Sequence, residues 1–178
     1  MSKYSLKDIL LGLAKTSVLL ILLELISSVI FPSLGLQNFK PAFNVLIVLF
    51  LAFKLETPGL AFIILALQYI HSVFSIEGWA AGTLTGVLIS LSVKYVREML
   101  NFSTAISTII VVQIFQLAWY FLITFIISLK MGDFSSFITI FIDYLPESLF
   151  LSAISHHFFL LMDRIWYVNK KQSMGAFL

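Results

Sequence analysis

The sequence has 178 residues, of which 60% are hydrophobic and only 11% are charged. An ordinary soluble domain is about half apolar and about a quarter charged, so these proportions exclude a water-soluble globule and leave lipid as the solvent. The sequence contains no cysteine, which excludes disulfide bonds, thiolate metal sites and cysteine nucleophiles. The net charge of +2 suggests a nucleic-acid partner only until the positions of the cations are considered.

Six apolar segments follow one another along the chain, and each is a candidate for a membrane-spanning helix. A span requires about 20 apolar residues, because a helix rises about 1.5 Å per residue across a hydrocarbon core of about 30 Å. The segments cover residues 9–31, 42–54, 58–75, 79–96, 102–129 and 146–167. Pro32 marks the end of the first segment, and Pro41 marks the start of the second. A further stretch, Phe134–Ile142, is too short to span and is predicted to lie half-submerged. The sequence therefore predicts an all-α polytopic membrane protein, a single transmembrane domain over residues 1–178, in which about six helices form a compact bundle.

The distribution of the cations predicts how these helices are oriented. With six spans and both termini in the cytoplasm, eight cations lie inside, and only Lys40 and Lys130 lie outside. The inner eight are Lys3, Lys7, Lys54, Lys94, Arg97, Arg164, Lys170 and Lys171. The positive-inside rule supports both the count and the orientation, so the basic excess is interpreted as a topology signal and no nucleic-acid partner is expected. Lys94 and Arg97 form a predicted cytoplasmic basic turn that offers a docking surface.

Polar side chains within the predicted spans are costly in lipid, so they are candidates for function. Glu24 lies near the middle of the first span, where a carboxyl group is expected to be protonated or paired. One interpretation is functional, with Glu24 as a proton or cation relay or as a ligand contact. The interpretation that we favour is an interhelical hydrogen bond to a residue such as Gln113 or His71. Gln113, Gln116 and Tyr120 share one stripe of the fifth helix, which favours contacts between helices over a polar pocket. These five residues form a candidate intramembrane polar cluster. The other polar residues of the spans are Asn44, Gln68, Glu147, His156 and His157.

The adjacent pair His156 and His157 raises the question of a metal site. Neighbouring helical residues point about 100° apart, so the two rings cannot share an ion. A site would need one of them together with Glu147 or Asp163 and a ligand from a second helix, and no paired-histidine metal motif occurs. No nucleophile elbow or phosphate-binding glycine loop occurs either. We therefore expect no metal, no cofactor and no catalytic residues, and the chain is not expected to be an enzyme.

Small residues recur every four positions in the fourth segment, at Gly78, Gly82, Gly86 and Ser90. A glycine face allows a second helix backbone to approach closely. The face is interpreted either as a docking surface for a partner's transmembrane helix or as packing within the six-helix body, and the sequence favours neither.

The layout of the chain resembles the MreD family of bacterial rod-shape-determining membrane proteins. A first span is followed by a proline-led second one, Lys40-Pro41-Ala42-Phe43, and by a polar residue with a glycine seven positions on, from His71 to Gly78. A small-residue helix, a basic cytoplasmic turn and a long fifth span come next, and the last helix contains Leu151–Arg164. The resemblance covers most of the chain as a pattern of spans.

The resemblance implies a non-catalytic scaffold of the cell-wall elongation machinery in the bacterial cytoplasmic (inner) membrane. Its expected partners are an MreC-like bitopic membrane protein and other components of the elongation complex that couple cytoskeletal MreB to peptidoglycan synthesis. MreD-like proteins are similar in fold to the substrate-binding subunits of energy-coupling-factor transporters, so a subunit that binds a small, vitamin-type solute is the alternative. Its pocket would be lined by Glu24, His71, Gln113 and Gln116. An intramembrane hydrolase is a third alternative, but no nucleophile–base pair can be constructed for it.

Overall fold

The computed structural model describes residues 6–35, 39–55, 57, 59–75, 78–96 and 104–166. Within these ranges every regular element is helical, which confirms the all-α prediction. The elements are α1 (Leu6–Leu25), the π-helix η1 (Ile26–Ile30), α2 (Phe31–Ser33), α3 (Phe43–Lys54), α4 (Leu60–His71), α5 (Trp79–Val96), α6 (Ala105–Met131), α7 (Phe137–Asp143) and α8 (Leu145–Ile165). Lys3, Arg97, Lys170 and Lys171, which enter the predicted topology, lie outside the described residues.

Four helical stretches are long and apolar enough to cross a membrane: Lys7–Ser33, Trp79–Val96, Ala105–Met131 and Phe137–Ile165. The structure thus confirms the character of a helical membrane protein. Helices α3 and α4 have 12 residues each, which corresponds to about 18 Å and is less than the thickness of the hydrocarbon core. Six spans therefore remain a prediction.

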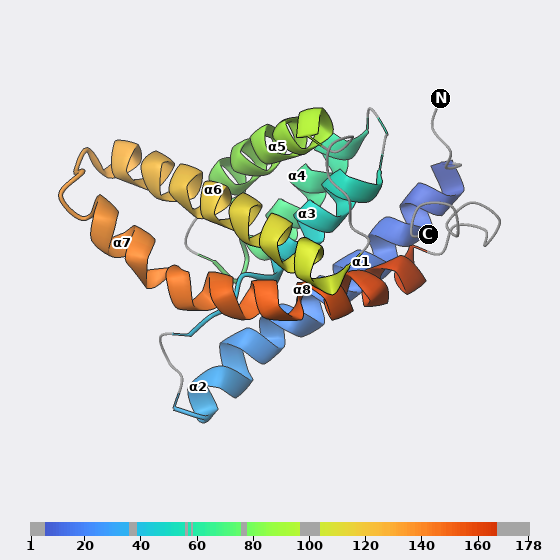
Figure 1. Cartoon of the computed structure of the whole chain (residues 1–178), viewed down its shortest axis with the longest axis horizontal. Coiled ribbons are helices and arrows are strands. Elements are labelled where there is room, and N and C mark those ends of the chain that lie inside the picture. The colour runs from blue at the N-terminus through green and yellow to red at the C-terminus, as the bar shows by residue number, and fades with distance from the viewer. Residues whose placement is uncertain are drawn as a thin grey trace.

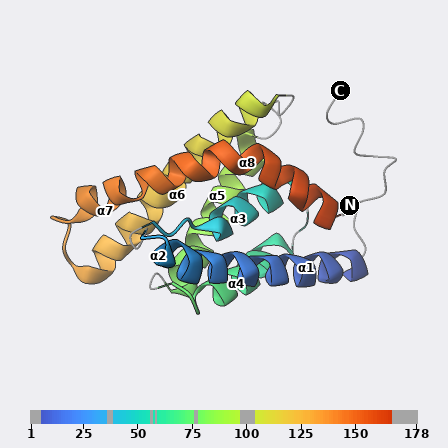
Figure 2. The same cartoon turned by 90° about the horizontal axis from the view of Figure 1, so that it is seen from below.

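Helix α3 lies at the centre of the molecule, between α1 on one side and α8 on the other (Figures 1 and 2). Every residue from Phe43 to Phe53 is buried, so α3 presents no face to lipid. A helix that is apolar on nearly all sides is stable when lipid or other helices surround it, and other helices surround α3. This central position explains why segment 42–54 is apolar apart from Asn44 and Lys54 and yet shorter than a span.

Helix α1 continues through η1 and α2 to Ser33 and forms the longest rod of the amino-terminal half (Figure 1). Pro32, expected to end the first span, lies within the last turn of this rod. One side of the rod packs against α3, α4 and α8, and the other side exposes large apolar residues. The start of α1 and the end of α8 lie on the same side of the molecule, where the indole Nε1–H of Trp166 donates to Thr16 Oγ1 at 2.8 Å.

The ends of α6 are set by residues with strong local preferences. Thr104 and Ser107 form a reciprocal capping box at its start, and Gly132, with φ +68°, adopts the left-handed conformation that ends it. Helix α7 follows and has no buried residue among its seven. It corresponds to the stretch Phe134–Ile142 that was predicted to lie half-submerged. Pro146 occupies the first turn of α8, where its missing N–H is no loss.

Candidate functional site

Glu24 of α1 and His71 of α4 form a buried pair at the centre of the candidate site. Oε1 of Glu24 lies 2.7 Å from Nδ1 of His71, and the side chains are only 1% and 8% exposed. His71 is one of the two partners considered for Glu24 from the sequence. The other, Gln113, donates from Nε2 to Ser148 Oγ at 3.1 Å. The pair links α1 to α4, which is what an isolated carboxyl group within a membrane helix requires.

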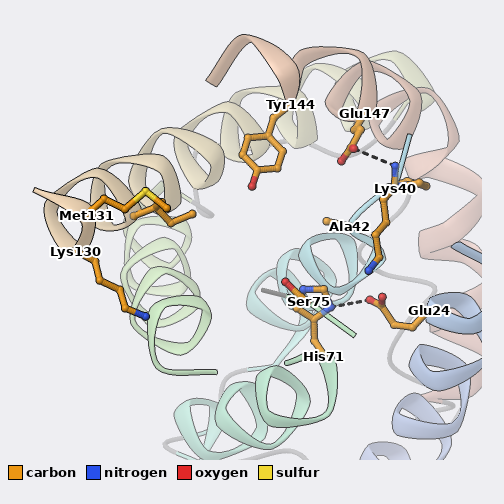
Figure 3. Close-up of a pocket in the computed structure, with 11 residues that line it drawn as sticks. Glu24, Lys40, Ala42, His71, Ser75, Lys130, Met131, Tyr144 and Glu147 are labelled. Atoms are coloured by element: carbon orange, nitrogen blue, oxygen red, sulfur yellow. Dashed lines mark hydrogen bonds and ion pairs between the residues drawn. The ribbon is translucent and has the colours of Figure 1, made fainter. Parts of the chain in front are cut away.

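A pocket of about 500 Å³ adjoins this pair (Figure 3). Its lining comes from the last turn of α1, the segment before α3, the end of α4 and the residues just after it, the last turns of α6 and the start of α8. The lining residues are Glu24, Lys40, Pro41, Ala42, His71, Ser75, Ile127, Lys130, Met131, Tyr144 and Glu147. Five segments that are far apart in the sequence therefore build one cavity, and it contains both acidic and basic groups.

Lys40 holds three of these segments together. Its backbone N–H donates to Glu147 Oε1 at 3.1 Å, and its ammonium group donates to the backbone carbonyl of Phe74. Figure 3 shows its side chain directed into the pocket, toward Glu24 and Ser75. From the sequence, Lys40 and Lys130 were assigned to topology alone, and neither was predicted as a site residue. Lys40 and Glu147 each adjoin a proline that begins a helix, but nothing in the sequence indicates that they meet.

The polar stripe of α6 packs against α8 and does not line the pocket. Ser152 Oγ donates to Gln116 Oε1 at 3.1 Å, beside the contact between Gln113 and Ser148. The ring of Tyr120 stacks on that of Tyr144, with centroids 4.6 Å apart and planes 14° apart. Gln113 and Gln116 therefore make contacts between helices on the face of α6 that meets α8, and neither lines the pocket beside Glu24 and His71.

The glycine face of α5 is occupied from within the molecule. A Cβ atom on Gly82 would lie 2.4 Å from Gln68 Oε1, and one on Gly86 would lie 2.8 Å from Ile64 Cγ2. Gly78 precedes α5 with φ +80°, and Ser90 donates its hydroxyl to the backbone carbonyl of Val87. Gly82 and Gly86 thus pack closely against α4 and α6 within the chain, which favours the packing alternative, and the docking of a partner on this face stays a prediction.

The remaining polar residues of the spans lie apart from the pocket. Asn44 Nδ2 donates to Gln68 Oε1 at 3.3 Å, in a buried contact between α3 and α4. His156 is half-buried and His157 is exposed, with ring centroids 5.6 Å apart. Within the described residues, no group of three or more metal-ligating side chains comes together. Lys94 is exposed at the end of α5.

No protein-family model, curated protein or solved structure matches this chain.

Proposed function

We propose that this chain is a non-catalytic scaffold of the bacterial cell-wall elongation machinery, which holds an MreC-like bitopic protein in the cytoplasmic membrane. The proposal rests first on the pattern of spans, with Lys40-Pro41-Ala42-Phe43 before the second segment and the interval from His71 to Gly78. It also rests on the way the polar residues of the spans are used.

The observation that carries the proposal is that these polar residues join helices of the chain to one another. Glu24 and His71 link α1 to α4, Gln116 and Ser152 link α6 to α8, and Trp166 links α8 to α1. In a membrane, interhelical hydrogen bonds and close packing hold helices together, since lipid provides no hydrophobic drive between them. The result is a body of defined shape, which is what a protein that positions others needs.

The partner's helix needs an exposed apolar surface, and the rod formed by α1 and η1 offers one. Five large apolar residues spaced three, four or seven positions apart share one side of this rod. These residues are Leu11, Val18, Leu22, Leu25 and Val29. Each is 45% to 62% exposed. The proposal assigns the partner's transmembrane helix to this α1 strip.

The test uses the absence of cysteine from the native sequence. Val18→Cys and Val29→Cys variants, labelled with a photoactivatable maleimide, are expected to cross-link to a co-expressed MreC-like partner. Ile114→Cys on α6, at a position that is 59% exposed, serves as the matched control and is expected not to cross-link. Equal cross-linking from all three positions would contradict the α1 strip. Failure of the partner to co-purify, together with unchanged cell shape on deletion of the gene, would contradict the scaffold itself.

A second candidate function is the substrate-binding subunit of a transporter for a small, vitamin-type solute. The pocket of about 500 Å³ beside Glu24 and His71 favours it, because ligand pockets have volumes of about 300–1,000 Å³. A solute that binds only the folded state raises its melting temperature by mass action. Stabilisation by such a solute, without co-purification of an elongation partner, would favour this candidate over the scaffold.

A further inference from the structure

The acidic groups of the pocket already have partners within the protein. Oε1 of Glu24 is engaged by the His71 ring, and Oε1 of Glu147 accepts the backbone N–H of Lys40. Both glutamates are buried, at 1% and 7% exposure. A ligand cation would therefore have to compete with contacts that the fold itself provides.

The basic groups of the pocket have capacity to spare. Lys130 is exposed at the end of α6 and makes no hydrogen bond or ion pair with any described residue. The ammonium group of Lys40 donates to the carbonyl of Phe74, which uses one of its three protons. Figure 3 shows the two lysines on opposite sides of the pocket, each with its amino group directed toward the space between them. Both cationic side chains of the pocket thus have donor protons that no described residue uses.

The rest of the lining is mainly apolar. Pro41 and Ala42 contribute one wall, Ile127 and Met131 contribute another, and the ring of Tyr144 lies between Lys130 and Glu147 in Figure 3. Such a lining, with a few fixed polar groups, is typical of sites that bind small molecules. Lys130 also stands at the end of a predicted span, at the level where lysine side chains reach the lipid headgroups.

We propose that this pocket binds a ligand in which an acidic group, phosphate or carboxylate, is joined to an apolar body. The acidic group lies between Lys40 and Lys130, and the apolar body contacts Ile127 and Met131. The ligand is either the headgroup and adjoining chain of an anionic lipid or a soluble acid of the same chemistry. This inference names the ligand class that the second candidate function needs, and it stands independently of the scaffold proposal.

The first experiment measures the melting temperature of the purified full-length chain in a neutral detergent. Hexyl phosphate and hexanoate are the acidic probes, and hexanol and hexyltrimethylammonium are the neutral and cationic controls. The acidic probes are expected to raise the melting temperature in a saturable way, whereas the controls are not. Equal stabilisation by hexanol or by the cationic probe would overturn the proposal.

Variants then locate the binding site. Lys130→Gln removes a charge that makes no hydrogen bond or ion pair with any described residue, so the unliganded melting temperature is expected to stay the same. Its dissociation constant for hexyl phosphate is expected to rise about tenfold, since a charge-assisted hydrogen bond is lost. Lys94→Gln, at an exposed position on α5 outside the pocket, is the matched control and is expected to bind as the native chain does. An unchanged dissociation constant in Lys130→Gln would overturn the proposal.

A second experiment distinguishes the two sources of the acid. The chain is reconstituted in vesicles of phosphatidylcholine mixed equally with phosphatidylglycerol, extracted, and analysed by native mass spectrometry. Retention of phosphatidylglycerol by the native chain, its loss in Lys130→Gln and its displacement by hexyl phosphate support a lipid ligand. Binding of hexyl phosphate without retained phosphatidylglycerol supports a soluble acid. If neither acid binds, the proposal is wrong, while the cross-linking test of the α1 strip is unaffected.

Discussion

The pair of Glu24 and His71 predicts an asymmetry between single and double substitutions. In His71→Leu, the carboxyl group of Glu24 stays 1% exposed and loses its 2.7 Å contact. Removing one partner of a buried pair costs about 3–5 kcal/mol, so we expect a loss of about 3 kcal/mol in the free energy of unfolding. Glu24→Leu leaves the buried imidazole of His71 without its partner, and should cost about 1–3 kcal/mol. The double variant replaces both groups with apolar ones and should be nearly as stable as the native chain.

The assay is reversible unfolding in mixed micelles with increasing sodium dodecyl sulfate, followed by circular dichroism for all four proteins of the cycle. Single losses of about 3 and about 1–3 kcal/mol, with a double variant that is nearly as stable as the native chain, imply a coupling free energy of about 4–6 kcal/mol between the two positions. Glu24→Gln is the conservative control, because an amide oxygen still accepts a hydrogen bond from the ring. If the double variant lost as much stability as the two single variants added together, the two side chains would not act as a pair, and the reasoning would be refuted.

Substitutions at three other contacts between helices test the packing of the chain, each by the same unfolding measurement. Gly86→Leu should lower the free energy of unfolding by about 1–3 kcal/mol, because its Cβ atom would overlap α4. The control Ala80→Leu, on the exposed side of α5, should change it little. A larger loss in Ala80→Leu than in Gly86→Leu would show that the glycine face is free. Trp166→Phe and Thr16→Val should each lower the free energy of unfolding by about 1 kcal/mol, because each removes the same 2.8 Å hydrogen bond, and the double variant should lose no more than either single one. Additive losses would mean that this hydrogen bond is unimportant. Lys54→Met should lower the free energy of unfolding by at most about 1 kcal/mol, because the 3.1 Å ion pair of Lys54 with Asp163 of α8 is only partly buried. A larger loss would show that lipid excludes water from this pair.

Several helix ends were predictable because they depend on local preferences. Pro41 precedes α3, and Gly132 ends α6 in a left-handed conformation. The partner of Glu24 was also partly predictable, because an isolated carboxyl group in a span requires a polar neighbour and few candidates exist. In contrast, the apolar run of α3 does not show whether it spans the membrane or fills a core, since both settings favour a continuously apolar sequence. Its burial on every side is a property of the assembled helices.

The pocket itself was not predictable, because its residues meet only in the folded chain. Lys40 and Glu147 are 107 positions apart. Helical periodicity correctly groups Gln113 and Gln116 on one face of α6, yet it does not show which neighbour that face meets. That neighbour is α8, which both side chains contact, and neither side chain lines the pocket beside Glu24 and His71. The basic residues of the pocket, Lys40 and Lys130, are topology signals in the sequence, and this interpretation is compatible with a second role in binding a ligand.

Unequal helix lengths explain why a pocket exists at this place. Helix α3 has 12 residues and α6 has 27, which correspond to about 18 Å and about 40 Å. Pro41 and His71, at the pocket ends of α3 and α4, therefore adjoin a cavity whose wall is continued by Ile127 and Lys130 of the longer α6. The short length of α3 and α4 leaves the count of six spans open, and the same short length leaves room for a ligand beside the end of α6. Any acid bound there would lie over the buried pair of Glu24 and His71, and its apolar body would complete the packing that the short helices leave unfilled.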